Sequence, residues 1–190
     1  LYYTWFERQL AVDRDVSDQF LVFNYLDKAS SSLAFQNEMD FSLSKHWSLR
    51  GAYKFLRVTA LFNGSLQQQT MVPAHRILAT ISWVSLNKRW QADLTTNFVG
   101  RMRMPKGYVI NGVPHNFSPW YPFVFGQVAH QFKRLKVYLG VENLLNVKQP
   151  NPILFASNPQ DPSFDATMVW GPITGVNVYG GMTFILKQKK

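Results

Sequence analysis

The chain contains no cysteine, which excludes disulfide bonds, thiol catalysis and thiolate metal sites. It contains no run of about 18 apolar residues either, so the sequence predicts no transmembrane helix. Charged residues make up only 16% of the 190 residues, whereas they make up about a quarter of ordinary globular domains. These absences leave two candidate classes, a membrane β-barrel and a soluble β-sandwich with an aromatic core.

Signals for targeting, catalysis and metal binding are also missing. No basic, apolar and cleavable segment opens the sequence, which predicts either a cytosolic chain or a mature or truncated product. No GxSxG motif, phosphate-binding loop or dinucleotide fingerprint occurs. None of the histidines (His46, His75, His115 and His130) has a second histidine or a carboxylate at metal-ligand spacing, and His46 and His75 are expected to cap turns. The sequence thus predicts no enzyme, no metal site and no cofactor.

Aromatic residues, by contrast, reach 15%, and the mean hydropathy is -0.15. Both values fit a membrane β-barrel, in which apolar and polar residues alternate. The net charge is +9, but the basic residues do not form one run, and several of them lie in short turns, at Lys45, Lys88-Arg89 and Lys133-Arg134. Basic turns at one rim suit an anionic membrane surface or plain solubility, so nucleic acid is not expected as a partner.

Strand patterns run along the whole chain. In residues 175–186, apolar Val178, Met182 and Phe184 alternate with Asn177 and Thr183, which places the two sets on opposite faces of a strand. Such a period does not decide between a protein core and lipid. The sequence predicts nine strands, over residues 1–12, 20–27, 33–44, 47–62, 75–86, 90–100, 121–132, 135–146 and 175–186.

These strands are long, at about ten residues or more, and tilted membrane strands need about 9–11 residues. Toward the C-terminus the connections alternate between short and long, which is typical of periplasmic turns and extracellular loops. Trp47 and Trp90 each follow a short basic turn and predict an aromatic girdle. Leu94 and Phe98 are predicted to face lipid, while the facing of residues 121–132 is ambiguous. The polar residues expected to line the lumen are Gln36, Glu38, Asp40, Gln91, Asp93 and Asn97.

The number of predicted strands, nine, is odd. If the short turns and the C-terminus are periplasmic, the first strand starts on the extracellular side. Single-chain bacterial barrels instead have an even number of strands, and an open sheet in lipid would leave unpaired backbone groups at both edges. We therefore expect the chain to be the C-terminal part of a larger barrel.

Three segments resemble TonB-dependent outer-membrane receptors. Residues 137–152, VYLGVENLLNVKQPNP, resemble their penultimate strand, where a GVENL-x-N pattern precedes a long loop. Residues 151–153 and 164–173 resemble the matching loop of receptors from Bacteroidetes-type bacteria. The last strand resembles the C-terminal barrel-assembly signal of outer-membrane barrels at Tyr179, Gly181, Phe184 and Leu186. It departs from the family at Gly175-Val176, where Gly-Arg is usual.

The resemblance implies that residues 1–190 are the C-terminal portion of an antiparallel transmembrane β-barrel domain, about nine strands of roughly 22, without the plug domain that closes such a lumen. It implies TonB-dependent import of a scarce ligand, of the siderophore-iron, haem, cobalamin or glycan class, across the bacterial outer membrane. The implied partners are outer-membrane lipid, the missing N-terminal strands and plug, the TonB energy-coupling complex acting through that plug, and the barrel-assembly machinery.

Two long loops, residues 101–120 and 147–172, are predicted to face outside. In the first, Arg101, Arg103, His115 and Trp120 are predicted to contact an extracellular ligand, since cations attract anionic chelates and aromatic rings stack on flat groups. The alternative is that these side chains only hold the loop in place. Two other interpretations of the chain stay open: a small porin-like or adhesive barrel of about eight to ten strands, and a soluble all-β binding domain.

Overall fold

The structure is a computed structural model that describes residues 1–17, 20, 22–26, 30–62, 65–110, 112–184 and 186. Within these ranges the protein is all-β, its strands pair antiparallel, and it has no helix. The described residues accordingly contain no helix that could span a membrane.

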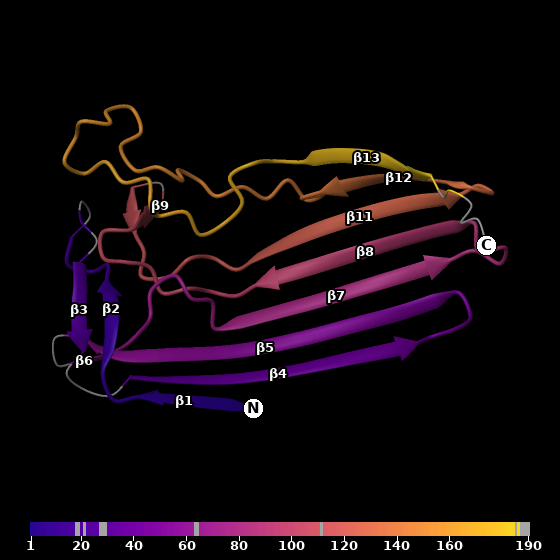
Figure 1. Ribbon diagram of the computed structural model, residues 1–190. Helices are drawn as coiled ribbons and strands as arrows, with labels where there is room; N and C mark the ends of the chain where they lie inside the picture. Colours follow the sequence, from indigo (N-terminus) through magenta and orange to yellow (C-terminus); the bar gives the residue numbers. More distant parts are fainter. Residues whose placement is uncertain are drawn as a thin grey trace.

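One large, twisted sheet dominates the molecule (Figure 1). Along its path, each strand pairs with the next in the order β1 (Tyr2–Phe6), β4 (Ser30–Ser42), β5 (Trp47–Phe62), β7 (His75–Val84), β8 (Trp90–Val99), β11 (Tyr121–Gln131), β12 (Leu135–Glu142) and β13 (Asn177–Phe184). The short strand β6 (Ser65–Gln68) pairs with β5 beside this path. Strands β1 and β13 form the two edges and are not paired with each other among the described residues, so the sheet is open.

The prediction of one continuous strand over residues 1–12 was wrong. This segment bends at Glu7 and Arg8 and divides into β1 and β2 (Gln9–Asp13). Strand β2 pairs with β3 (Val22–Leu26) in a separate two-stranded sheet, while β1 pairs directly with β4. Both halves of the segment keep a strand-like composition, and a hydrophobic pattern does not reveal where a chain bends between two strands.

The predicted odd number of strands along the path of the sheet, nine, was therefore wrong. The predicted strand over residues 20–27, of which 21 and 27 lie outside the described residues, belongs to the β2–β3 hairpin and not to the large sheet. Eight strands therefore follow the path of the sheet, and consecutive strands are antiparallel. Strand β1 runs toward the long loops, and β13 runs toward the short turns (Figure 1).

The register of the sheet separates two faces. Ile81 pairs with Leu94, Leu94 with Gly126, Gly126 with Val141, and Val141 with Val178. Side chains at paired positions lie on the same face, so this row belongs to an apolar face.

The row one residue along is Ser82, Asp93, Gln127, Gly140 and Tyr179, which belongs to a polar face. The predicted separation of Leu94 and Phe98 from Asp93 and Asn97 is therefore confirmed. The ambiguity over residues 121–132 is resolved too, because Gly126 and Val128 pair with the apolar row positions Leu94 and Ala92.

Short turns lie at one end of the sheet and long loops at the other (Figure 1). The loop between β8 and β11 contains the small hairpin of β9 (Val109–Ile110) and β10 (Val113–Pro114). A buried hydrophobic cluster lies at the end of β8, in this loop and in the loop before β13, and consists of Val99, Met102, Met104, Tyr108, Met168 and Trp170.

Candidate membrane-facing surface and loop cluster

The apolar face of the large sheet is uncovered in the structure. In the middle of the sheet, Ile81 is 42% exposed, Leu94 44% and Leu139 61%. A water-soluble β-domain covers such a face with a second layer, and soluble monomers rarely expose large continuous apolar patches. The face is therefore suited to contact with lipid or with another apolar surface.

An aromatic band crosses this face at the loop end. Its centre is His75, whose ring stacks on Tyr53 and on Trp120 with centroid distances of 6.1 and 5.8 Å. The Tyr53 hydroxyl and His75 Nδ1 are hydrogen-bonded at 2.8 Å. We call this group the loop-end band; with the flanking rings it comprises Phe35, Tyr53, Phe55, His75, Phe98 and Trp120. His75 thus lies in a strand and does not cap a turn.

A second band lies at the short turns. Trp47 and Trp83 are 6.4 Å apart between ring centroids, and His130 lies 4.3 Å from Trp90 and 4.5 Å from Phe132. We call these five residues the turn-end band. Trp47 and Trp90, which predicted a girdle from the sequence, both belong to it. Trp90 of this band and Phe98 of the other lie eight residues apart in β8, which is about 26 Å along a strand.

The opposite face carries polar contacts. Arg50 Nε and Asp40 Oδ1 form an exposed ion pair at 2.6 Å, and Lys136 Nζ donates to Gln91 Oε1 at 3.0 Å. All six residues that were predicted to line a lumen share this face by register: Gln36, Glu38, Asp40, Gln91, Asp93 and Asn97.

The long loops hold one another through a buried core. Trp170 Nε1 donates a hydrogen bond to the Tyr108 hydroxyl, which joins the two loops. Gln149 Oε1 accepts from the Trp170 amide at 2.7 Å, and its Nε2 donates to the Met168 carbonyl at 2.8 Å. Burial raises the pKa of Tyr108, and the hydrogen bond from Trp170 acts in the opposite direction. We call this group of residues from the two loops, centred on Tyr108, Gln149, Met168 and Trp170, the loop cluster. It is a packed structure whose buried polar side chains are hydrogen-bonded.

Arg103, one of the predicted ligand residues, lies inside this loop structure. Its guanidinium forms an ion pair with Asp15, donates from Nη2 to Gln67 Oε1 at 2.7 Å and from Nη1 to the Gln68 carbonyl at 3.3 Å. These contacts connect the loop between β8 and β11 with the turn after β2 and with β6. Arg103 thus joins three segments of the loop end.

The other three predicted ligand residues have different surroundings. Trp120 belongs to the loop-end band on the apolar face. Arg101 and His115 are exposed, and no hydrogen bond or ion pair of either side chain occurs within the part of the chain that the structure describes. Of the four, only Arg101 and His115 are accessible polar groups on the loops.

Asn143, in the GVENLLN segment, has a role that the sequence did not reveal. It is 1% exposed, with φ at 53°. Its Oδ1 accepts from the Val147 amide at 2.9 Å, and its Nδ2 donates to the carbonyls of Val147 and Thr174 at 2.8 and 2.9 Å. Asparagine tolerates a positive φ and supplies a donor and an acceptor, so it can hold the start of the long loop against its end.

The residues of the predicted barrel-assembly signal divide between the two faces of β13. Tyr179 and Gly181 lie on the polar face, and the Tyr179 hydroxyl donates to Gln127 Oε1 at 3.3 Å. Phe184 lies on the apolar face, and Leu186 follows the strand and is exposed.

Comparison with known proteins does not assign a family: no family model matches the chain, and no curated protein matches it significantly.

Proposed function

We propose that the chain is part of the wall of an outer-membrane β-barrel, with its apolar face toward lipid and its polar face toward the lumen. The observation that carries this proposal is the pair of aromatic bands at the two ends of one uncovered apolar face. Transmembrane barrels have an apolar band of about 25 Å between two such girdles, because aromatic rings favour the membrane–water interface.

Within this class, we propose a TonB-dependent receptor that imports a scarce ligand. The support is the resemblance of residues 137–152 and of the last strand, together with the open sheet. The backbone groups at the outer edges of β1 and β13 have no strand partner among the described residues. Lipid cannot satisfy such groups, so further strands of a larger barrel would pair with them. The polar face would then meet the plug.

The test is active uptake by cells that produce the full-length protein. Cells are supplied in turn with a ferric siderophore, haem, cobalamin and an oligosaccharide, and binding and uptake are measured with and without an uncoupler of the proton gradient. We expect one ligand to bind in both conditions and to enter only with the gradient. Uptake that continues after uncoupling, as through a porin, would contradict the receptor proposal.

Ligand contact by the loops can be separated from loop stability. In the full-length protein, Arg101→Ala should weaken binding of an anionic ferric chelate at unchanged surface abundance, because its charge is exposed and faces no internal partner in the described structure. Arg103→Ala should instead lower abundance, because it leaves Asp15 without its ion pair. If Arg101→Ala leaves the affinity unchanged at both low and high salt, Arg101 is not part of the site.

A small barrel is the second candidate, since eight strands follow the path of the sheet and an even number allows closure. In that case β1 would pair with β13. The chain lacks cysteine, so Tyr3→Cys can be combined with Val178→Cys or Met182→Cys and oxidised in outer membranes. A disulfide within one chain would support the small barrel, whereas the receptor proposal predicts none.

A further inference from the structure

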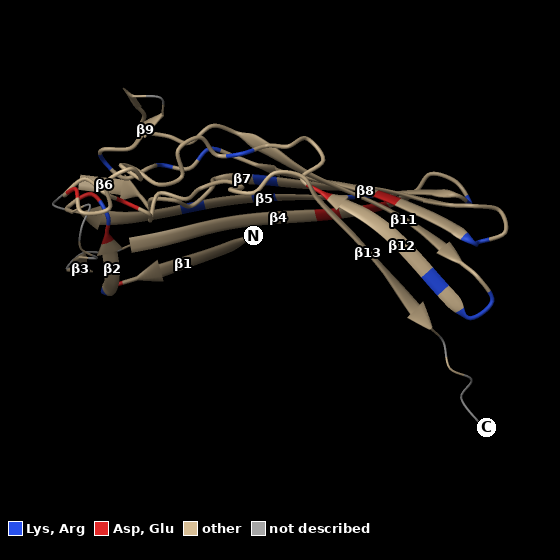
Figure 2. Ribbon diagram, turned by 90° about the horizontal axis from the view of Figure 1, so that it is seen from above, with Lys and Arg blue, Asp and Glu red and all other residues tan. Residues whose placement is uncertain are grey.

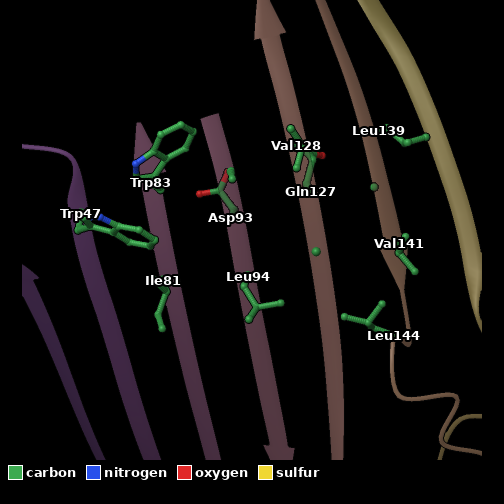
Figure 3. Close-up of a pocket in the computed structure, with 13 residues that line it drawn as sticks. Trp47, Ile81, Trp83, Asp93, Leu94, Gln127, Val128, Leu139, Val141 and Leu144 are labelled. Atoms are coloured by element: carbon green, nitrogen blue, oxygen red, sulfur yellow. The ribbon is translucent and has the colours of Figure 1, made fainter. Parts of the chain in front are cut away.

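The apolar face is hollowed near its centre. The hollow measures about 570 Å³ and lies over β7, β8, β11 and β12, between Ile81, Leu94, Val128, Leu139 and Leu144 (Figure 3). Pockets that hold small molecules measure about 300–1,000 Å³. The hollow is therefore large enough for one chain-like apolar group.

Gly126 creates much of this space, because it occupies a position on the apolar face and contributes no side chain. A Cβ at this position would make only an ordinary contact, at 3.8 Å from Leu94 Cδ1. The backbone at Gly126 thus does not require glycine for lack of room, and the hollow can be filled by substitution.

A second hollow continues the first toward the short turns. It measures about 420 Å³, and Trp47 and Trp83 line both hollows. Its other walls include His46 and Asn87, which belong to two adjacent turns. The first turn is joined to the end of β7, just before the second turn, by a hydrogen bond from the Val84 amide to the His46 carbonyl at 2.9 Å. The two hollows form a path from the middle of the apolar face, past two tryptophans, to a polar end.

The polar end of this path is basic. Lys45 lies in the first turn, and Lys88 and Arg89 lie in the second; all three are exposed. Residues 43–46 and 85–89 contain no aspartate or glutamate, and the blue basic positions mark the short turns in Figure 2. Cations near a membrane surface attract anionic lipids.

We propose that this path binds one anionic phospholipid, with an acyl chain in the hollow beside Gly126 and its phosphate near Lys45, Lys88 and Arg89. The proposal rests on the proposed placement of the apolar face in a membrane. The chemistry of the occupant follows from the path itself: an apolar length, two interfacial tryptophans and a cationic end.

The experiment uses the full-length protein in phosphatidylcholine vesicles. A fixed fraction of the lipid is replaced either by brominated phosphatidylglycerol or by brominated phosphatidylcholine, both with bromine on their acyl chains. Quenching of tryptophan fluorescence by each lipid is then measured. Brominated phosphatidylglycerol should quench several-fold more efficiently at the same mole fraction, and Trp83→Phe should remove much of this difference.

Two pairs of variants test the two ends of the path. Lys45→Gln with Lys88→Gln should weaken the preference for phosphatidylglycerol about thirtyfold, whereas Lys106→Gln with Lys148→Gln, at the loop end, should leave it unchanged. Gly126→Leu should abolish the preference by filling the hollow. Gly51→Leu is the control, because Gly51 is a strand position with open space that lines neither hollow.

The outcomes distinguish this proposal from the proposed function. Equal quenching by the two brominated lipids, or a preference that survives both Gly126→Leu and the Lys45 and Lys88 changes, would overturn the lipid site and leave the membrane face intact. Absence of quenching by either lipid would mean that the apolar face does not contact acyl chains at all, and the membrane proposal itself would fail.

Discussion

The ring of Tyr179 occupies the space that a side chain at Gly140 would fill. A Cβ at Gly140 would lie 2.2 Å from Tyr179 Cζ, and a Cβ at Gly181 would lie 2.4 Å from the Tyr138 hydroxyl oxygen. Gly140 pairs with Tyr179 and Tyr138 pairs with Gly181, so the two arrangements are reciprocal across β12 and β13. An aromatic ring over a facing glycine restores packing that the glycine lacks. Two residues of the predicted assembly signal therefore also fasten the last strand to its neighbour.

Replacement of three glycines by alanine should lower the free energy of unfolding by amounts that increase from Gly51 to Gly140 to Gly100. Gly51→Ala should change the free energy of unfolding by less than about 0.5 kcal/mol, because nothing lies within 4 Å of the new Cβ. Gly140→Ala should cost about 1 kcal/mol, since the Tyr179 ring can swing away. Gly100→Ala should cost about 3 kcal/mol, because its Cβ would lie 2.7 Å from the His75 carbonyl oxygen. Denaturant unfolding of the full-length protein in detergent measures this order, and a smaller effect at Gly100 than at Gly140 would contradict it.

The two faces should differ in their tolerance of charge. Leu94→Arg places a cation on the apolar face and should destabilise the inserted protein by about 2–4 kcal/mol if that face meets the middle of the bilayer. Thr95→Arg, on the polar face next to Thr80, should have little effect. The folded, heat-shifted fraction in outer membranes gives the measurement. Equal tolerance of both variants would refute the assignment of lipid to the apolar face.

Asn143 should be essential for the loop before β13. Asn143→Ala removes three hydrogen bonds from buried groups and leaves alanine at a φ of 53°, so we expect a loss of about 2–4 kcal/mol. Asn146 has the same φ but is exposed, and Asn146→Gly should be nearly neutral. Protease cleavage within residues 143–176 reports the difference; similar cleavage rates for both variants would argue against the role of the Asn143 side chain.

The loop cluster should lose stability at high pH. Burial raises the pKa of Tyr108 above its ordinary value of 10.0, which means that the folded loops favour the neutral phenol. The resulting stabilisation is complete below about pH 10 and disappears as the pH rises through the raised pKa. Tyr108→Phe should make protease resistance of the loops less dependent on pH, at the cost of the hydrogen bond from Trp170. Tyr25→Phe is the control, because Tyr25 is 76% exposed. Loss of resistance at the same pH in wild type and Tyr108→Phe would exclude Tyr108 as the cause.

The alternation of apolar and polar residues along the sequence predicted the main strands well, because each of these strands has one apolar and one polar face. The predicted strand over residues 90–100 became β8 with the expected facing, and the strand over 47–62 became β5 with the same bounds. The bend at Glu7 and Arg8 was missed, since period-two patterns continue on both sides of it. The short strand β6 was missed as well, because the polar composition of residues 65–68 is typical of a loop.

The candidate sites depended on contacts that are distant in the sequence. Arg103 pairs with Asp15 across 88 residues, so its participation in loop packing could not be predicted from its neighbours. Trp120 belongs to a loop in the sequence, yet its ring joins His75 and Phe98 on the apolar face. Trp47 could be placed correctly, because it follows a short turn directly and the turn fixes its height on the sheet.

The spacing of the two aromatic bands sets a hydrophobic thickness for any membrane that surrounds this sheet. Trp90 and Phe98, which lie eight residues apart in β8, are about 26 Å apart along the strand, and a strand tilt of about 40° reduces this distance to about 20 Å along the membrane normal. A typical bilayer core is about 30 Å thick, and the bacterial outer membrane is thinner than average. The hydrophobic height of the sheet thus matches a thin bilayer. In a thicker bilayer, either the surrounding lipid would have to become thinner or the strands would have to tilt less.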